Sequence, residues 1–526
     1  MKTRQHGPSL FWRACLALGL MVFFYTFAIL LAVVLFSIPV VIYENTERIY
    51  GHLLSLCWLA AGGIVLSIIP RRVRFVAPGP LLSEAEYPAL FEVIRQVAQT
   101  TGQAMPKEVY LLHDMNAFVS QRGGVMGFFS RRVMGIGLPL LEILTVPEFK
   151  AVLAHEFGHY RSGDTSLGPW IYVTRASIIR TIGNMNNSVF QFLFVWVGNL
   201  FVRITHAVSR QQEFAADAVA VQAVGREAVT GGFRKSEMHG GAFSCYVQNE
   251  WLPMLSDRVV MPLIPGYRAM LAAPEMPAFL ERMAQERREA EAKADPYSTH
   301  PTMQQRLDAV AELAGGDAPA DEGGETADHT QAITLIPDLA ATEKWLFNTV
   351  LVAPKDLGTR RRVEWEDVLE VVYFPLWHES LKRYQEELRG IRVGELGDIL
   401  ADPDRLASLF VRPSAMNDGA AWQAEVRNVI GTSLSLVLSA RGYKGSAMPG
   451  HGVRFVCGAL TVCPFGRNAG EEAKAGLPAA WADFFSETGL GDALLSEGFD
   501  AYQAKKMIEE MCKYESVCYG GGEPRS

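Results

Sequence analysis

Three residues in one short segment have the types and spacing of a metal-assisted hydrolytic site. His155 and His159 are four residues apart in AVLAHEFGHYRSGD, so a helix places both imidazoles on one face. Such a pair can bind one Zn²⁺. Glu156 follows the first histidine and can accept a proton from a water molecule whose pKa the ion has lowered towards about 7. The segment therefore predicts a zinc site that activates water.

A catalytic zinc ion needs a third protein ligand and an open position for water. One extended zinc-protease pattern has a third histidine six residues after the second, but Thr165 stands there. In the Ala-rich segment RQQEFAADAVAVQAVG, Glu213 and Asp217 share a helical face. Glu213 can complete a His₂Glu site, and Asp217 can accept a hydrogen bond from a ligand histidine. Paired carboxylates are usually a solvated face, but the apolar flanks here favour neutralisation by a metal.

The ordered series HEFGH, EFAAD and STHPTMQQR resembles the HtpX-like and CAAX-prenyl-protease-type integral-membrane zinc metalloendopeptidases. The resemblance covers roughly residues 14–313. It implies one Zn²⁺ per chain, bound by His155, His159 and Glu213. It also implies Glu156 as the general base and Asp217 as a residue that orients a ligand. The expected fold of this part is zincin-like.

The same resemblance implies roles for residues outside the two helices. His300 and Arg306 match the family's pair near the site, where a cation can stabilise the tetrahedral oxyanion. Considered alone, His300-Pro301 is better explained as a turn that enters a helix. The strands expected at 116–120 and 133–138 would line the cleft, where an exposed edge can bind an extended peptide. From the residues alone, an ordinary structural hairpin explains these strands equally well.

The elements that position these residues can be predicted from periodicity. A surface helix is expected over 83–101, and another helix begins at Pro147 with Glu148 near its positive end. Strands are expected at 108–112, 117–120 and 133–138, the last two joined by a turn that contains Gly123, Gly124 and Gly127. Further helices are expected over 275–293 and 301–313.

Apolar residues are concentrated near the N-terminus. Residues 14–43 and 49–69 carry no formal charge, and both exceed the roughly 20 residues of a membrane-spanning helix. The short connection predicts an antiparallel hairpin, and soluble core helices, the alternative, rarely run this long without charge. By the positive-inside rule, both free ends and everything after residue 74 are expected to be cytoplasmic. The basic residues that set this orientation are Lys2, Arg4, Arg13, Arg71, Arg72 and Arg74.

A second apolar region lies between the two ligand segments, at 167–182 and 189–202. All ligands must lie on one side of the membrane, so this region crosses it either twice or not at all. Each piece is short for a full span, and Arg175 and Arg180 are costly inside a bilayer. An interfacial or partly inserted helical pair is therefore favoured, with two crossings as the alternative.

Composition limits the remaining possibilities. The chain has 526 residues, a net charge of −8 and only 20% charged residues, which argues against a nucleic-acid-binding protein. The expected fold is mainly α with a small β-sheet, comprising a transmembrane hairpin (1–74), a zinc metallopeptidase domain (75–313), a Gly- and Asp-rich linker (314–334) and an α+β C-terminal domain of unknown function (335–526).

The leading hypothesis is a multi-pass membrane endopeptidase, in the inner membrane if the chain is bacterial. Its catalytic domain would be cytoplasmic, and its substrates would be polypeptides in or near the membrane. The HtpX branch implies quality control of membrane proteins, and the other branch implies cleavage of prenylated peptides. The alternative is a catalytically silent membrane scaffold or adaptor with a structural zinc site. The oligomeric state is left open.

Overall fold

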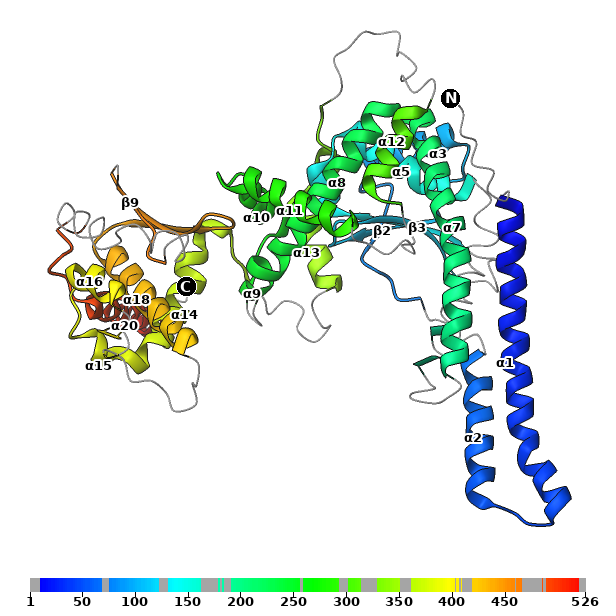
Figure 1. The fold of residues 1–526 in the computed structure, drawn as a ribbon. Helices are drawn as coiled ribbons and strands as arrows, with labels where there is room; N and C mark the ends of the chain where they lie inside the picture. Colours follow the sequence, from blue (N-terminus) through cyan, green and yellow to red (C-terminus); the bar gives the residue numbers. More distant parts are fainter. Residues whose placement is uncertain are drawn as a thin grey trace, which may run out of the picture. The chain divides into compact units, whose positions relative to one another are not determined.

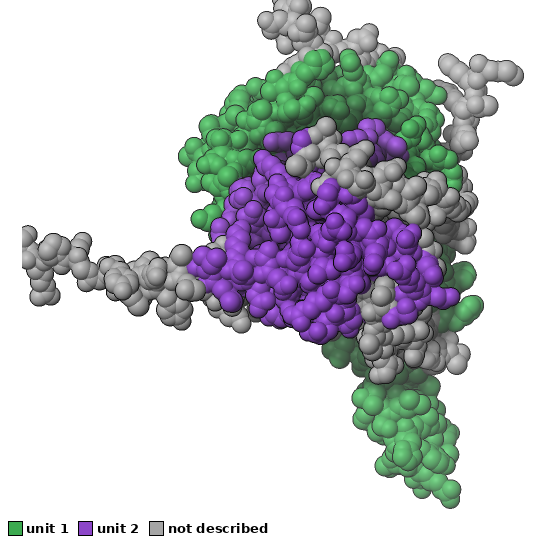
Figure 2. Space-filling model, turned by 90° about the vertical axis from the view of Figure 1, so that its left-hand side faces the viewer, with its two compact units in different colours: residues 1–243, 280–354 green, residues 244–279, 355–526 purple. Residues whose placement is uncertain are grey.

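The computed structural model describes residues 10–68, 75–122, 131–161, 178–179, 182–183, 191–255, 259–292, 301–313, 329–350, 361–402, 404–405, 408, 419–458, 460–465, 485 and 489–519. The chain divides into unit 1, residues 1–243 and 280–354, and unit 2, residues 244–279 and 355–526 (Figure 2). Helices predominate, and the described strands form small sheets (Figure 1). The predicted class, mainly α with small sheets, is confirmed. The domain boundaries expected at 74, 313 and 334 stay predictions.

Unit 1 begins with two long apolar helices, α1 (Leu10–Thr46) and α2 (Gly51–Ile68). They lie side by side in opposite directions, and the N-terminal half of α7 (Gln191–Val224) lies along α1 (Figure 1). Their shared buried cluster consists of Met21, Phe24, Ala28, Ala32, Leu35, Ala61, Ile64, Ile68, Ile178 and Phe201. Packing between apolar faces therefore holds the three helices together.

The outer faces of α1 and α2 are also apolar. Leu30 is 58% exposed and Leu59 is 76% exposed. Within the described part of the chain, Leu18–Thr46 is the one segment that is long and apolar enough to cross a membrane, judged by length and composition. The apolar part of α2, Gly51–Leu66, is shorter.

Unit 1 contains a sheet of four described strands. Its order is β1 (Leu81–Leu82), β2 (Glu108–Leu112), β4 (Arg131–Gly137) and β3 (Ala117–Arg122). The predicted hairpin is confirmed, because β3 pairs antiparallel with β4 and Val119 lies opposite Met134. Its glycine-rich turn lies outside the described residues. Strand β2 pairs with β4 in parallel, which leaves β3 at the edge of the sheet.

Helix α3 (Pro88–Thr101) begins five residues later than the predicted 83–101. Ser83 accepts hydrogen bonds from the backbone N–H groups of Glu86 and Tyr87, which form a turn instead of a first helical turn. Pro88 then occupies the first turn of the helix, where its missing N–H group costs nothing. Short helix α4 (Leu138–Ile143) follows the sheet.

Helix α5 (Val146–Arg161) carries the HEFGH motif and begins with a capping box. Thr145 Oγ1 accepts a hydrogen bond from the Glu148 N–H at 3.4 Å, and Glu148 Oε2 accepts one from the Thr145 N–H at 2.8 Å. Lys235 of α8 (Arg226–Tyr246) donates to the same carboxylate at 2.7 Å. These bonds fix the start of α5 three turns before the histidines.

Helices α5 and α7 approach closely at Gly158. A Cβ atom there would lie 2.8 Å from the Cα and 3.0 Å from the carbonyl oxygen of Ala216. The neighbours are backbone atoms, which cannot move aside as a flexible side chain can. The absence of a side chain at Gly158 therefore lets the two helices bring their polar residues together.

We expect Gly158→Ala to lower the free energy of unfolding by about 1–3 kcal/mol, because the added methyl group forces α5 away from α7. Gly240→Ala is the matched control, since a Cβ at Gly240 in α8 meets nothing within 4 Å. That control is expected to stabilise the helix by roughly 0.5–1 kcal/mol. Thermal unfolding of the detergent-solubilised variants checks both, and equal stability of the two would contradict the close approach.

The last segments of unit 1 fold back onto its earlier part. Helix α12 (Met303–Glu312) packs on α7, and α13 (Leu339–Val350) follows the short 3₁₀ helix η2 (Ala332–Leu335). The hydroxyl groups of Tyr87 and Thr342 are 3.1 Å apart and form a buried hydrogen bond. Unit 1 thus includes residues from beyond the predicted linker.

Unit 2 has a helical core with a small antiparallel sheet, β7 (Lys444–Met448), β8 (Gly452–Cys457) and β9 (Leu460–Val462). The two longest helices, α18 (Gly419–Ala440) and α20 (Leu495–Tyr519), pack together. Helix α11 (Met276–Ala292), close to the predicted 275–293, follows α10 (Leu263–Leu271). Shorter elements are η1 (Val247–Trp251), α9 (Leu252–Met254), β5 (Val259–Val260), β6 (Arg361–Arg362), η4 (Trp365–Asp367), η5 (Leu369–Tyr373), α14 (Phe374–Leu381), η6 (Lys382–Tyr384), α15 (Gln385–Leu388), η7 (Val393–Glu395) and α16 (Leu396–Ala401).

Candidate metal centre

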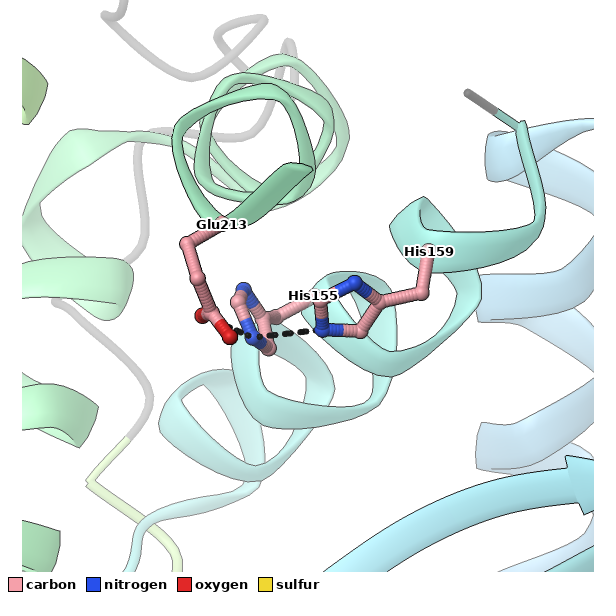
Figure 3. A group of neighbouring side chains, drawn as sticks. All are labelled: His155, His159 and Glu213. Carbon is pink, nitrogen blue, oxygen red and sulfur yellow. Dashed lines mark hydrogen bonds and ion pairs between the residues drawn. The ribbon is translucent and has the colours of Figure 1, made fainter. Parts of the chain in front are cut away.

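Two helices bring three potential ligands together. His155 and His159 project from α5, and Glu213 projects towards them from α7 (Figure 3). One potential ligand atom from each residue lies within 4.8 Å of the others. The two Nε2 atoms are 3.2 Å apart, and Nε2 of His155 is 3.5 Å from Oε2 of Glu213. The sequence predicted these residues as neighbours, and the structure places them so.

This donor set fits a zinc ion. Tetrahedral ligands at about 2.0–2.1 Å from Zn²⁺ are separated from one another by about 3.3 Å, close to both distances above. His155 and Glu213 are each 7% exposed. Burial and the adjacent His155 lower the pKa of His159 to about 4, so its imidazole is neutral at pH 7 and has a free electron pair.

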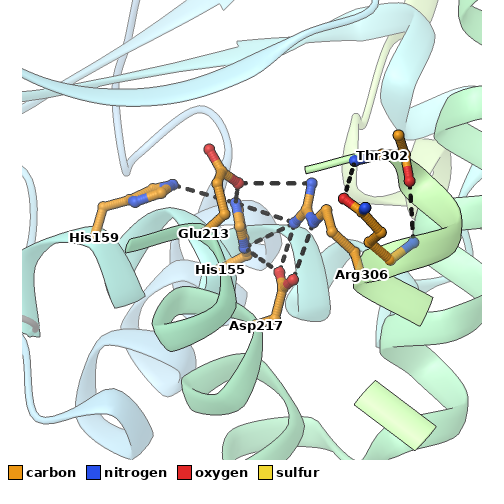
Figure 4. Close-up of polar contacts among 7 residues, drawn as sticks. His155, His159, Glu213, Asp217, Thr302 and Arg306 are labelled. Atoms are coloured by element: carbon orange, nitrogen blue, oxygen red, sulfur yellow. Dashed lines mark hydrogen bonds and ion pairs between the residues drawn. The ribbon is translucent and has the colours of Figure 1, made fainter. Parts of the chain in front are cut away.

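Asp217 orients the first histidine. Its Oδ1 atom is 2.9 Å from Nδ1 of His155, which leaves Nε2 directed towards His159 and Glu213 (Figure 4). Asp217 is only 1% exposed. Burial would raise the pKa of Asp217, but hydrogen bonds with His155 and Arg306 hold it below its usual value. The carboxylate is therefore charged and can accept a hydrogen bond from the Nδ1–H group of His155.

Arg306 reaches the same group of side chains from α12. Its Nε and Nη2 atoms donate to the two oxygens of Asp217 at 3.0 and 2.5 Å (Figure 4). Its Nη1 atom is 3.7 Å from Oε2 of Glu213, and Nη2 is 3.2 Å from Nδ1 of His155. Arg306 thus neutralises two buried carboxylates, while its expected role at the oxyanion stays a prediction. His300 lies outside the described residues.

Glu156 lies on α5 between this group and the edge strand. Burial raises the pKa of Glu156, against the opposing influence of His155 and of a backbone hydrogen bond from Val119 of β3. A carboxyl group with a raised pKa holds a proton more readily, as a general base must. Its neighbour Val119 belongs to the strand with the open edge.

A known protein family matches the region that carries these residues. Residues 84–314 match the family model described as Peptidase family M48. The curated relatives are named as HtpX proteases or their homologues. Residues 84–314 are therefore similar to peptidase family M48, and to its HtpX proteases in particular. The prediction made from the motif series is therefore confirmed.

The similarity to individual M48 relatives is partial. The Protease HtpX homolog of Tropheryma whipplei is 31% identical over 156 residues, which is 26% of this chain and 52% of the relative. Protease HtpX of Idiomarina loihiensis is 28% identical over 165 residues, 28% of this chain and 56% of the relative. Protease HtpX homolog 2 of Methanosarcina acetivorans is 25% identical over 214 residues, 37% of this chain and 68% of the relative.

The chain thus spans about half the length of the first two of these relatives. The M48 match ends at residue 314, and most of unit 2 lies beyond it. No solved structure matches the chain.

Two residues of the M48 domain near the site were not predicted from sequence. Phe233 of α8 packs its ring under the Arg306 guanidinium, 4.1 Å from the ring centroid, and its edge meets His155. Nothing in the sequence around Phe233 indicates this contact. Gln305 bonds to α7 through Arg210 at 2.6 Å. The sequence did contain a signal for Gln305. Thr302 and Gln305 have the spacing that is typical of a capping box.

Proposed function

We propose that this protein is a membrane-anchored zinc endopeptidase. The observation that carries the proposal is the convergence of His155, His159 and Glu213, with a desolvated carboxyl group at Glu156 beside them. Structural zinc sites usually have four protein ligands, whereas catalytic sites keep a position open. The described residues supply three ligands here. This difference disfavours a silent scaffold with a structural zinc ion.

A bound Zn²⁺ would polarise the scissile carbonyl group and lower the pKa of water. The chain's own residues then transfer the proton that this water molecule loses. Glu156 accepts it on a carboxylate oxygen as water attacks the carbonyl carbon, and donates it to the leaving amine nitrogen when the C–N bond breaks. His155, held by Asp217, and His159 fix the ligand geometry through both steps.

The position of β3 supports binding of an extended polypeptide. This strand is at the edge of its sheet, packs against α5, and bonds to Glu156 through the Val119 backbone. A substrate strand pairing with this edge would place its main chain beside the general base. Backbone pairing tolerates many sequences, which fits flexible or unfolded segments as substrates.

The apolar helices support a position at the membrane. We infer that α1 and α2 insert as a hairpin, because their outward faces are apolar and exposed. Helix α7 runs unbroken from its contact with α1 to Glu213, so the metal centre would lie close to the bilayer. Substrates in or near the membrane, including damaged membrane proteins, follow from this position.

The expected orientation has the catalytic domain in the cytoplasm. A cysteine introduced at Thr46, the last residue of α1, into a chain whose seven natural cysteines are replaced tests it. We expect a membrane-impermeant thiol reagent to label this residue in intact cells. If the reagent labels this cysteine only after the cells are lysed, the orientation is the opposite of the one expected.

Peptide hydrolysis by the purified chain tests the function itself. We expect cleavage of a casein substrate that stops after treatment with a zinc chelator and returns when Zn²⁺ is added, because the ligand set fits zinc. Sustained cleavage after verified removal of the metal would contradict a metallopeptidase. No cleavage by metal-loaded protein in detergent or in liposomes would favour the scaffold.

A further inference from the structure

Side-chain hydrogen bonds join helix α12 to α7 and α8 near both of its ends. Gln305 bonds to Arg210 of α7, and Arg306 bonds to Asp217 of α7. At the far end of α12, Arg226 of α8 donates to the carbonyl oxygen of Leu313 at 2.6 Å. Only the second of these contacts belongs to the metal centre described above.

A single atom of Gln305 serves two purposes in the first of these contacts. Its Oε1 accepts a hydrogen bond from the Thr302 N–H at 3.2 Å, while Thr302 Oγ1 accepts one from the Gln305 N–H at 3.2 Å. The same Oε1 accepts a hydrogen bond from Nη2 of Arg210 at 2.6 Å. The cap of α12 is therefore bonded directly to α7.

The partners of this bond are each close to a residue of the metal centre. Arg210 precedes Glu213 by three residues, so both lie on one face of α7. Gln305 directly precedes Arg306 in the first turn of α12. A long, flexible arginine side chain can reach its partners only when the backbone that carries it is fixed nearby.

We propose that Gln305 and Arg210 form a positioning pair that holds Arg306 against Asp217, His155 and Glu213. This inference rests on the proposed function, because its consequence is a properly oriented zinc site. Residues that support metal ligands in this way affect both metal affinity and turnover.

The neighbouring Gln304 offers a matched control. Its side chain donates to Asp308 within α12 at 2.7 Å and does not contribute to the cap. The conservative variant Gln305→Glu keeps the acceptor. A carboxylate can accept both hydrogen bonds that Oε1 accepts, and the capping box has either glutamate or glutamine at this position.

The test compares Gln305→Ala, Gln305→Glu, Gln304→Ala, Arg210→Ala and the Arg210/Gln305 double alanine variant. Zinc affinity is measured by competition with a chromophoric chelator, and kcat and KM are measured on a casein-derived peptide. We expect Gln305→Ala and Arg210→Ala each to lose about tenfold in zinc affinity and in kcat, with KM unchanged. The double variant should be no worse than either single variant.

Gln305→Glu is expected to behave like the wild type, and so is Gln304→Ala. Wild-type zinc affinity and kcat in folded Gln305→Ala would overturn the proposal. Equal losses in Gln304→Ala, or a failure of Gln305→Glu to restore zinc affinity, would show a general effect on α12 and also overturn it. If the wild type hydrolyses no peptide, the proposed function fails, while the affinity comparison still decides the positioning role.

Discussion

Glu156→Gln is expected to abolish peptide hydrolysis while leaving zinc bound. The glutamine side chain has nearly the same shape but cannot accept a proton, and general-base catalysis typically contributes about 10²–10⁴-fold to the rate. The ligands His155, His159 and Glu213 keep their atoms and their contacts. The measurement pairs kcat/KM on a casein-derived peptide with the zinc content of the same preparation.

A surface variant, Glu312→Gln on the exposed end of α12, controls for the loss of one negative charge. It should match the wild type in rate and in zinc content. Undiminished cleavage by Glu156→Gln would show that another group accepts the proton. Loss of zinc from this variant would instead assign Glu156 to the ligand set.

Asp217→Ala is expected to reduce both stability and metal binding. Asp217 is 1% exposed and receives two hydrogen bonds from Arg306, so its removal leaves this mostly buried cation with only the more distant carboxylate of Glu213. Breaking such a pair costs about 3–5 kcal/mol. The ligand His155 also loses the acceptor at its Nδ1 atom, which should weaken zinc binding about 10–100-fold.

Second substitutions separate the two effects. The double variant Asp217→Ala/Arg306→Met should recover part of the stability, because the poorly paired cation is gone, yet should not recover zinc affinity. Asp217→Asn keeps an oxygen for His155 and should lose less zinc affinity than Asp217→Ala. Thermal unfolding and chelator competition measure both quantities. Wild-type zinc affinity in Asp217→Ala would contradict the orienting role.

Local periodicity was sufficient to predict the parts of the site that lie within one helix. The spacing of His155 and His159 predicts one helical face, and α5 has it. The acids at Glu213 and Asp217 in an apolar, Ala-rich segment likewise predicted neighbours on a helix, which α7 provides. The contact between these two helices was predicted because a catalytic zinc ion needs a third protein ligand.

Contacts between distant segments were harder to predict. The parallel pairing of β2 with β4 joins the strand before the hairpin to the second strand of the hairpin, and no local pattern marks it. Helix α7 combines the apolar stretch from Gln191 to residue 202 with the ligand segment, because nothing between them breaks a helix. The contact of Phe233 with Arg306 depends on how α8 and α12 pack, which periodicity does not determine.

The zinc content of purified protein tests the central claim most directly. Detergent-solubilised wild type, His159→Ala and Glu213→Ala are each loaded with Zn²⁺, passed over a desalting column and analysed by elemental mass spectrometry. We predict about one zinc ion per wild-type chain and almost none in either variant, because each variant keeps only two of three ligands. Zinc that remains at wild-type levels in both folded variants would contradict the site proposed here.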